Sequence, residues 1–224
     1  NNYSREHRMP FSWINFNNIT RPQFESTPEG TDLHALELVN NDDVNFYRSN
    51  LPFSDDIVAQ TYSYLDFRRG DDSRGKDVAE IRDDRKGDAA RAVFYMMLCY
   101  NGKYAQNWGL NGLLSDSENQ EISQLLQWHN NDPVDDFEAA RNEYIFSQQN
   151  NRNPFVDFPQ LVDCIDFTDM TLTGNCNIPL STETLTEEQA SLKIAPQPAN
   201  SQFQVFLVAP AAETIELTIT NLAG

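Results

Sequence analysis

The first fifty residues constrain the fold most, because extended and turn-forming stretches alternate there around the chain's chemically active side chains. Residues 3–7 are expected to form a short strand, residues 15–31 a loop rich in Asn, Thr, Pro and Gly, and residues 33–39 a second strand. Asn41-Asp42-Asp43 is typical of a helix start and places residues 44–48 in the first helical turns. The predicted order is strand, loop, strand, helix.

The same stretch contains two of the three histidines, His7 and His34, each within two residues of an acid, Glu6 or Asp32. An Asn/Arg/Asn cluster follows at residues 45–50. A carboxylate, an amide oxygen and an imidazole from so short a span can hold a hard divalent cation beside a general base. The pattern therefore indicates hydrolysis of a phosphodiester.

The composition is that of a globular protein, with 39% hydrophobic and 22% charged residues in 224. No run of about 18 apolar residues occurs, so no membrane-spanning helix is expected. The net charge of −18 argues against indiscriminate binding to nucleic acid. Binding would need a local basic groove, for which the candidates are Arg5, Arg8, Arg21 and Arg48. Scattered, solvated arginines are the competing interpretation.

The three cysteines have different expected roles. Cys99 falls in an apolar helical run and is expected to be a buried thiol. Cys164 and Cys176 flank a turn expected at residues 173–175, and we expect them to form a disulfide if the protein is exported.

Three helices are expected in the middle of the chain. Asp88 is expected to cap a core helix over residues 89–100, whose apolar residues recur at helical spacing, and a second helix is expected over residues 118–129. Asp132 is expected to cap a third, with Pro133 at its first position. An apolar stripe is expected on this third helix, with a buried or partly buried ion pair at its arginine. The members of the stripe are Val134, Phe137, Arg141, Tyr144, Ile145 and Gln148.

Two stretches are expected to lack helices. Residues 66–86 are rich in charge and are expected to be a solvated loop. After about residue 167 the composition changes, since Lys193 is the only later basic residue. Residues 202–208 and 214–220 alternate as strands do. Two strands are too few for an independent domain, so the tail is expected to begin a small β-sandwich.

Six motifs run in the order of a known family from residue 2 to about residue 166. They are Arg5-Glu6-His7-x-x-Pro10, Asp32-Leu33-His34, Val44-Asn45-x-x-Arg48-Ser49-Asn50, Lys86-Gly87-Asp88-x-Ala90-Arg91, Trp128-His129-x-x-Asp132-Pro133 and Asn151-Arg152-Asn153-Pro154-Phe155. Through them the chain resembles the endonuclease I family, a branch of the ββα-metal (His-Me finger) nucleases. Each motif alone is weak, and the shared order gives the resemblance its strength.

The resemblance implies roles for particular side chains. His7 matches the general base that takes a proton from the attacking water, and Glu6 and Asn45 match the ligands of one Mg²⁺, with Mn²⁺ or Ca²⁺ as alternatives. The other candidates would contact the substrate or support the site, and they are Arg5, Asp32, His34, Arg48 and Asn50.

The sequence departs from the family pattern at three points. Ala35 stands where the family often has a second histidine, Leu38 stands where it usually has a proline, and Arg8-Met9 replaces an apolar pair. None of these touches the implied base or metal ligands, so the implied chemistry is retained.

The expected architecture is therefore α+β. It consists of a mainly helical domain around a ββα-metal finger over residues 1–166, a linker over 167–190 and the beginning of a β-sandwich over 191–224. Residues 192–200, with Phe203, resemble the start of the C-terminal sorting domain of type IX secretion cargo. That resemblance implies export by secretion machinery and a secreted or cell-surface location. The expected function is that of a secreted, monomeric, metal-dependent endonuclease that cleaves DNA, or RNA, with little sequence specificity.

Two other interpretations stay open. A catalytically silent extracellular module on the same fold would bind nucleic acid or mediate adhesion, which the net charge of −18 favours; Glu6, His7 and Asn45 favour the enzyme. A zinc site of His7, His34 and His129 is less favoured, because His129 lies in a segment expected to close a helix end.

Overall fold

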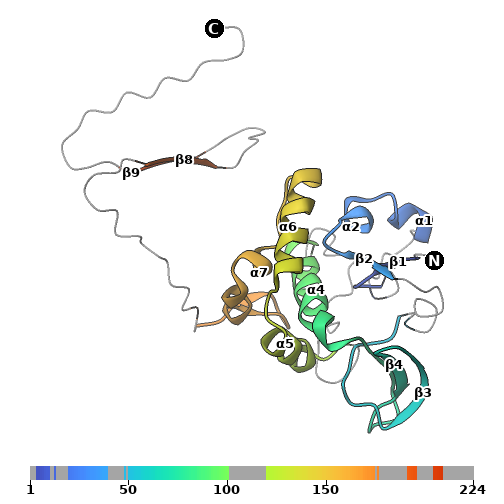
Figure 1. Cartoon of the computed structure of the whole chain (residues 1–224). Helices are drawn as coiled ribbons and strands as arrows, with labels where there is room; N and C mark the ends of the chain where they lie inside the picture. The colour runs from blue at the N-terminus through green and yellow to red at the C-terminus, as the bar shows by residue number, and fades with distance from the viewer. Residues whose placement is uncertain are drawn as a thin grey trace. The chain divides into compact units, whose positions relative to one another are not determined.

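The structure is a computed structural model that describes residues 4–10, 13, 20–39, 48, 50–100, 120–174, 176, 191–195 and 204–208. At residues 4–6, 21, 29, 38–39, 191–195 and 204–208 it describes the backbone alone. The chain forms two compact units, Asn1–Ile178 and Pro179–Gly224, and Figure 1 traces both. The larger unit contains all six motifs.

Helices and small antiparallel sheets mix along the larger unit, which confirms the expected α+β class. β1 (Ser4–His7) pairs with β2 (Leu36–Val39), and in this register His7 lies opposite Leu36. The connection between the two strands holds two short helices, α1 (Arg21–Phe24) and α2 (Pro28–Thr31), in a stretch that was expected to be loop alone. Both predicted strands are thus present, with two short helices between them.

The centre of the fold is α4 (Lys86–Tyr100), which appears in green in Figure 1. It begins two residues before the expected Asp88 cap, and Asp88 lies in its first turn. The helix is buried over most of its surface, including Val93, Met96 and Met97, as its apolar spacing predicted. The ring of Phe94 stacks on that of Phe167, with centroids 4.2 Å apart.

α5 (Ile122–Asn131) packs on α4 and carries the fully buried Trp128. The indole ring lies 5.3 Å from the ring of Phe53, and its N–H donates to Asp55 at 2.8 Å. Gln120, just before the helix, is buried and donates to the Phe53 carbonyl oxygen while accepting from its N–H. These contacts join the helical core to the segment that follows Arg48.

α6 (Asp136–Gln149) begins later than expected. Its N-cap is Asp135, whose side chain accepts a hydrogen bond from the backbone N–H of Glu138 at 2.7 Å. The cap expected at Asp132 is wrong, because that carboxylate instead accepts a hydrogen bond from the backbone N–H of Gly87 at 2.8 Å. Asp132 therefore serves the start of α4 rather than the start of α6.

The apolar stripe expected on α6 is wrong in part: Ile145 is buried and Arg141 is partly buried, as predicted, but the aromatic members are not. Phe137 and Tyr144 are 57% and 63% exposed, whereas Glu138 and Asn142 are buried. Glu138 receives two hydrogen bonds from the fully buried Arg91 of α4, at 2.8 and 2.5 Å. The buried face of α6 is polar because partners on neighbouring elements satisfy its side chains.

Three strands form a sheet, and two of them lie where the sequence predicted a charged loop over residues 66–86. The three strands are β3 (Ala59–Tyr64), β4 (Phe67–Asp71) and β5 (Asp77–Glu80), in the order β3-β4-β5. Charges pair across the strands: Arg69 donates to Asp77 of the next strand, and Arg68 forms an ion pair with Glu80. A short helix, η2 (Asp83–Arg85), leads from the sheet into α4.

The larger unit closes with α7 (Pro154–Asp157), η3 (Pro159–Cys164) and a small hairpin of β6 (Ile165–Asp166) and β7 (Thr171–Leu172). Cys164 and Cys176 form a disulfide, as expected, and the bridge lies within this unit. Cys99 is a free thiol, and it is exposed near the end of α4 rather than buried as predicted.

In the smaller unit β8 (Ser191–Ala195) pairs with β9 (Gln204–Val208) in an antiparallel hairpin. The strand predicted at residues 202–208 agrees with β9, and the strand predicted at 214–220 lies outside the described residues. Across the described parts of both units, each helix is too short or too polar to cross a membrane.

Candidate active site

His7 ends β1 and is half-buried. Its Nε2 atom lies 3.0 Å from the backbone carbonyl oxygen of Gly30, and its ring packs at a tilt against Phe24 with centroids 5.6 Å apart. Because a carbonyl oxygen only accepts hydrogen bonds, this contact requires the proton on Nε2. In the neutral ring the lone pair is then on Nδ1, which is the nitrogen able to take up a proton.

The Gly30 carbonyl is held in place by the turn between α1 and α2. Thr27 caps α2 by accepting a hydrogen bond from the Gly30 N–H at 3.2 Å, and its own N–H donates to the Phe24 carbonyl oxygen at 2.8 Å. A Cβ atom at Gly30 would lie 2.1 Å from that Phe24 oxygen, so only glycine fits here. The excursion between the two strands therefore positions the hydrogen-bond partner of His7.

Asp32 lies at the centre of a buried hydrogen-bond network rather than on a surface. Tyr95 and Tyr100 of α4 donate to its Oδ2 at 2.7 and 2.5 Å, and Gln149 of α6 and the His34 backbone N–H donate to its Oδ1 at 2.7 and 2.9 Å. Burial alone would raise the pKa of Asp32, but these hydrogen bonds lower it below its ordinary value. Asp32 thus ties the start of β2 to two helices.

His34 belongs to the same interior. It is 2% exposed, its Nε2 lies 3.3 Å from the Asn151 carbonyl oxygen, and its ring packs on Tyr95 with centroids 4.7 Å apart. Burial lowers the pKa of His34 against the opposing charge of Asp32, so the ring is held neutral. Arg141 fastens the same segment by donating to the carbonyl oxygens of Leu33 and Leu36.

Arg48 is 3% exposed and has helical backbone geometry. Its guanidinium carbon lies 4.1 Å from the ring centroid of Phe53 and 5.7 Å from that of Trp13, and Nη2 donates to the Arg8 carbonyl oxygen at 3.4 Å. Asn50 is exposed, and its carbonyl oxygen accepts a hydrogen bond from the Trp13 indole at 2.8 Å. Arg48 therefore braces the chain immediately after β1.

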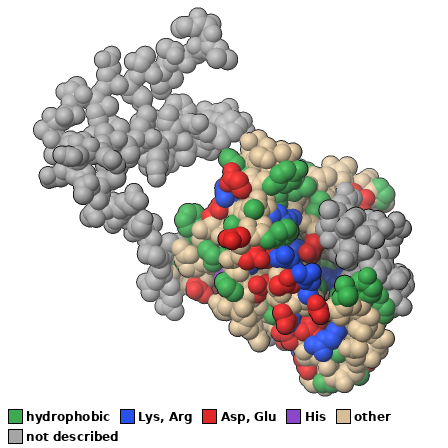
Figure 2. All heavy atoms as spheres, in the orientation of Figure 1, with side chains coloured by type: hydrophobic (Ala, Val, Ile, Leu, Met, Phe, Trp, Pro, Cys, Tyr) green, Lys and Arg blue, Asp and Glu red, His purple; other side chains and the backbone are tan. Residues whose placement is uncertain are grey.

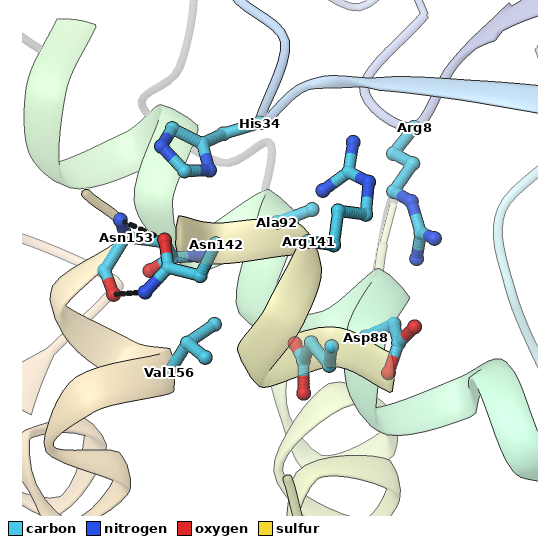
Figure 3. Close-up of a pocket in the computed structure, with 9 residues that line it drawn as sticks. Arg8, His34, Asp88, Ala92, Arg141, Asn142, Asn153 and Val156 are labelled. Atoms are coloured by element: carbon cyan, nitrogen blue, oxygen red, sulfur yellow. Dashed lines mark hydrogen bonds between the residues drawn. The ribbon is translucent and has the colours of Figure 1, made fainter. Parts of the chain in front are cut away.

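Arg8 follows His7 but lies on the interior side of the ribbon, 4% exposed, in an ion pair of 3.0 Å with Glu37. Figure 3 shows its side chain in a small polar pocket with Arg141 and Asp88, and with His34 on the opposite side. Burial raises the pKa of Asp88 to about 6, although the Arg8 charge opposes this shift. The pocket is lined by α4, α6 and the start of α7, together with Arg8 just after β1 and His34 just before β2.

The basic groove expected from four arginines is not built from Arg8 and Arg48, since both are buried. The side chains of Arg5 and Arg21 lie outside the described atoms. On the face drawn in Figure 2, Lys and Arg are mixed with Asp and Glu instead of forming one basic patch. Ion pairs among the described residues include Arg82–Asp84 and Arg152–Asp157.

The expected metal ligands fall only partly within the described structure. Glu6 is placed by its backbone in β1, opposite Glu37 of β2, and Arg5 is placed in the same way opposite Leu38. Asn45 lies outside the described residues. Among the residues that the structure describes, no three His, Cys, Asp or Glu side chains gather as a metal site.

The third histidine, His129, is buried in the last turn of α5. His129 closes α5, 8% exposed, with Nδ1 3.5 Å from Nη1 of Arg91 and its ring edge-on to Phe94. Burial, reinforced by the Arg91 charge, lowers the pKa of His129 to about 4. Its partners are those of a buried helix end, as the sequence predicted.

Known proteins match this chain over the unit just described. A sequence model of the endonuclease I family matches residues 1–160. The chain is 36% identical over 166 residues to an extracellular ribonuclease of Bacillus subtilis (strain 168), and 34% identical over 166 residues to an extracellular ribonuclease of Bacillus amyloliquefaciens. Each match covers 72% of this chain and 53% of the relative.

The chain belongs to the endonuclease I family. It spans about half the length of the curated relatives it matches. The family match ends before the disulfide, so the Cys164–Cys176 bridge and the β6–β7 hairpin lie after the matched residues.

Sequence reasoning missed one residue that matters at the site, Gly30. Thr27-Pro28-Glu29-Gly30 carries a usable signal, because a threonine followed by proline is typical of a helix start. The contact between its carbonyl and His7 joins residues 23 positions apart and leaves no local trace in the sequence.

Proposed function

We propose that the chain is an extracellular nuclease that hydrolyses phosphodiester bonds with His7 as its general base. The observation that carries the proposal is the 3.0 Å contact between His7 Nε2 and the Gly30 carbonyl oxygen, in a member of the endonuclease I family. That contact supports the tautomer in which Nδ1 can accept a proton. An imidazole is well suited to this role because it titrates near neutral pH.

We further propose that Glu6 and Asn45 hold one Mg²⁺, with Mn²⁺ or Ca²⁺ as alternatives. Glu6 precedes His7 in β1, and Arg48, three residues after Asn45 and beyond β2, has helical backbone geometry; this supports the proposal of a ββα-metal finger. A carboxylate and an amide oxygen are ligands that a hard cation prefers. When bound, such an ion stabilises negative charge on the phosphate and leaving-group oxygens.

The proposed reaction is hydrolysis by water. Nδ1 of His7 takes a proton from a water molecule as its oxygen forms a bond to phosphorus, and the bond from phosphorus to the leaving oxygen breaks with its electron pair on that oxygen. Because water is the nucleophile, the 2′-hydroxyl is not needed, so the proposal covers both RNA and DNA. Chemistry directed at phosphate carries no base information, which is consistent with little sequence specificity.

The proposed location is outside the cell. The relatives are extracellular ribonucleases, and disulfides such as Cys164–Cys176 persist in oxidising compartments. We propose that the β8–β9 hairpin begins a β-sandwich sorting domain, recognised by type IX secretion machinery, and that the nuclease acts as a monomer.

The test is digestion of a labelled single-stranded RNA and of plasmid DNA with Mg²⁺ or with EDTA. We expect cleavage of both substrates with Mg²⁺ and none with EDTA. We also expect RNA products without 2′,3′-cyclic phosphate ends, since attack by the 2′-hydroxyl would produce them. Cyclic ends would overturn the water mechanism.

The same assay separates the enzyme from a silent module. Binding of labelled RNA without cleavage, in Mg²⁺ and in Mn²⁺, would establish the silent binding module instead. Cleavage that persists in EDTA would remove the metal from the proposal while leaving His7 in place.

A further inference from the structure

The peptide group that follows His7 is held from two sides. β1 ends at His7, so Arg8 lies beyond the paired strands. The backbone N–H of Arg8 donates to the Ala35 carbonyl oxygen at 2.9 Å, and its carbonyl oxygen accepts a hydrogen bond from Nη2 of Arg48 at 3.4 Å. The second contact joins residues 40 positions apart in the chain. Arg48 therefore reaches the backbone one residue beyond the proposed general base.

The guanidinium of Arg48 is directed into the protein. The residue is 3% exposed, and its guanidinium carbon lies 4.1 Å from the ring centroid of Phe53 and 5.7 Å from that of Trp13. A planar guanidinium can stack on aromatic faces while its N–H groups donate hydrogen bonds in the same plane. A nucleic-acid strand approaches from solvent, so a side chain buried to this degree is better placed to support the site than to contact phosphate.

Phe53 gives this guanidinium a firm support. Its ring packs at a tilt on that of the fully buried Trp128 of α5, with centroids 5.3 Å apart. Its backbone is fixed as well, because the side chain of Gln120 accepts from the Phe53 N–H at 2.7 Å and donates to the Phe53 carbonyl oxygen at 3.1 Å. The helical core thus holds Phe53, Phe53 holds the Arg48 guanidinium, and the guanidinium holds the peptide group after His7.

This chain of contacts matters because a general base works only within hydrogen-bond reach of the water that it activates. A misplacement of about 1 Å can cost about 10²-fold in rate. The Gly30 carbonyl oxygen restrains the ring of His7 at 3.0 Å, but it does not touch the backbone that carries the ring. The contact from Arg48 restrains that backbone, so the two contacts act on different parts of the same segment.

We infer that Arg48 is a positioning residue of the nuclease: by holding the carbonyl group of residue 8 it keeps His7 where it can take a proton from water. This inference rests on the proposed nuclease function. The sequence left open whether Arg48 contacts the substrate or supports the site, and its burial against Phe53 favours support. Loss of the contact should therefore lower kcat and leave KM nearly unchanged.

The first test is the steady-state cleavage of a labelled RNA by Arg48→Lys, which keeps the positive charge and loses the planar group. We expect kcat to fall about 10- to 10²-fold, with KM changed by less than about twofold. The matched control is Arg85→Lys, because the Arg85 guanidinium carbon also lies over an aromatic ring, 4.3 Å from the centroid of Phe137. This control should leave kcat unchanged.

The second test observes His7 without turnover. The chain has three histidines, so the ring N–H signals of protein labelled with ¹⁵N-histidine can be assigned by comparison with His7→Ala. The His7 Nε2–H, which donates to the Gly30 carbonyl oxygen, should exchange slowly with water and give a resonance in the wild type and in Arg85→Lys. In Arg48→Lys that resonance should be lost, while the signals of the two buried histidines remain and show that the protein is folded.

A second variant guards against misfolding of Arg48→Lys. Phe53→Leu keeps the arginine and an apolar side chain in the core, but it removes the ring beneath the guanidinium. It should lower kcat in the same direction and also leave KM nearly unchanged. If Arg48 instead bound phosphate, Arg48→Lys would raise KM and weaken the salt dependence of RNA binding, with the His7 resonance intact, and that result would overturn the inference.

These outcomes are distinguishable from failure of the proposed function, which is judged by cleavage in the wild-type protein. A wild type that cleaves RNA, together with a folded Arg48→Lys that has the wild-type kcat or an unchanged His7 resonance, overturns the positioning role of Arg48 alone. A wild type that does not cleave RNA or DNA overturns the proposed function.

Discussion

His7 and His34 lie at the two neighbouring ends of the same two-stranded ribbon, yet their surroundings differ. His7 is half-buried, with Nε2 against one backbone carbonyl oxygen. His34 is 2% exposed and sits inside a network that includes Asp32, Tyr95 and Asn151. A ring that must gain and lose a proton needs the first environment, and a ring that must hold two helices to a strand needs the second.

The contrast shows why a histidine count is a poor guide to a site. Both histidines belong to motifs of the endonuclease I family, and both have an acid within two residues. The decisive difference is how deeply each ring is buried, which only the fold supplies. We therefore expect substitutions at the His7 end to affect the reaction, and substitutions at the His34 end to affect the free energy of unfolding.

The largest expected effect is on catalysis. His7→Ala should lower the rate of RNA and DNA cleavage by about 10² to 10⁴, which is the usual cost of losing a general base. The free energy of unfolding should change little, since His7 is only half-buried. Cleavage rates measured under excess enzyme test the expected loss of activity. Urea unfolding of the same protein tests the expected lack of change in stability.

Metal rescue provides the control. Excess Mg²⁺ should partly restore Glu6→Ala and Asn45→Ala, which lose a ligand, and should not restore His7→Ala, which loses a proton acceptor. Wild-type cleavage by His7→Ala would remove His7 from the mechanism.

The next effect is on stability. Asp32→Ala should lower the free energy of unfolding by about 3 to 5 kcal/mol, because four hydrogen-bond donors lose their shared acceptor in the interior. Asp32→Asn, which keeps one oxygen acceptor, should cost less. Urea unfolding measures both. A loss of activity in Asp32→Ala without a loss of stability would instead assign Asp32 a direct role with substrate.

The sequence predicts the apolar part of this architecture well. The spacing of apolar residues over 89–100 identifies α4, and the helix is indeed buried at Val93, Met96 and Met97. Hydrophobic burial depends mainly on periodicity, and periodicity is a property of the local sequence. The β1 and β2 strands were likewise foreseen from local patterns.

The polar part could not be predicted in the same way. α6 buries Glu138 and Asn142 because Arg91 and Asn153, 47 and 11 residues away, supply their partners. The sequence does not predict β4 and β5, because charged residues such as Arg69 and Asp77 are typical of loops. In the fold they lie on neighbouring strands and pair with each other. Charges that pair over long separations have no local signature.

The same limit applies to the site. His7 and the motif around Arg48 could be picked out from the sequence, but the carbonyl of Gly30 that fixes the His7 tautomer could not. The burial of Arg48 against the ring of Phe53 could not be predicted either, because it is a tertiary contact without a local sequence pattern.

A third prediction uses pH to compare buried and half-buried histidines. The pKa of His129 is lowered to about 4 in the folded protein, against an ordinary value of 6.5. Between pH 6.5 and 4 the unfolded chain binds a proton that the folded chain does not, so stability falls as pH falls through this window. The full loss is up to about 3 kcal/mol.

His129→Gln cannot titrate and should flatten that part of the stability curve. Urea unfolding at half-unit pH steps measures the slope for both proteins. An identical slope would show that His129 is not the group responsible.

The smallest effects are expected within the Asp32 network, where two tyrosines can be compared directly. Tyr100→Phe removes one hydrogen bond to Oδ2, 2.5 Å in length, and should cost about 1 kcal/mol while Tyr95 still donates to the same oxygen. Tyr95→Phe should cost more, about 1 to 3 kcal/mol, because the Tyr95 oxygen also accepts a hydrogen bond of 2.8 Å from Asn151. Losing it leaves the partly buried Asn151 amide without that acceptor.

Both variants should cleave RNA at the wild-type rate under conditions where they stay folded, since the hydrogen bonds that they lose join the tyrosines to Asp32 and Asn151 and not to His7. The Asp32 pKa should rise in each, because fewer hydrogen bonds stabilise its charge, and acid unfolding should begin at higher pH. If Tyr100→Phe lowered the free energy of unfolding more than Tyr95→Phe does, the hydrogen bond at the end of α4 would contribute more to stability than the contact with Asn151. If either variant lost activity while folded, the expectation that the His7 end of the ribbon affects the reaction and the His34 end affects stability would be wrong.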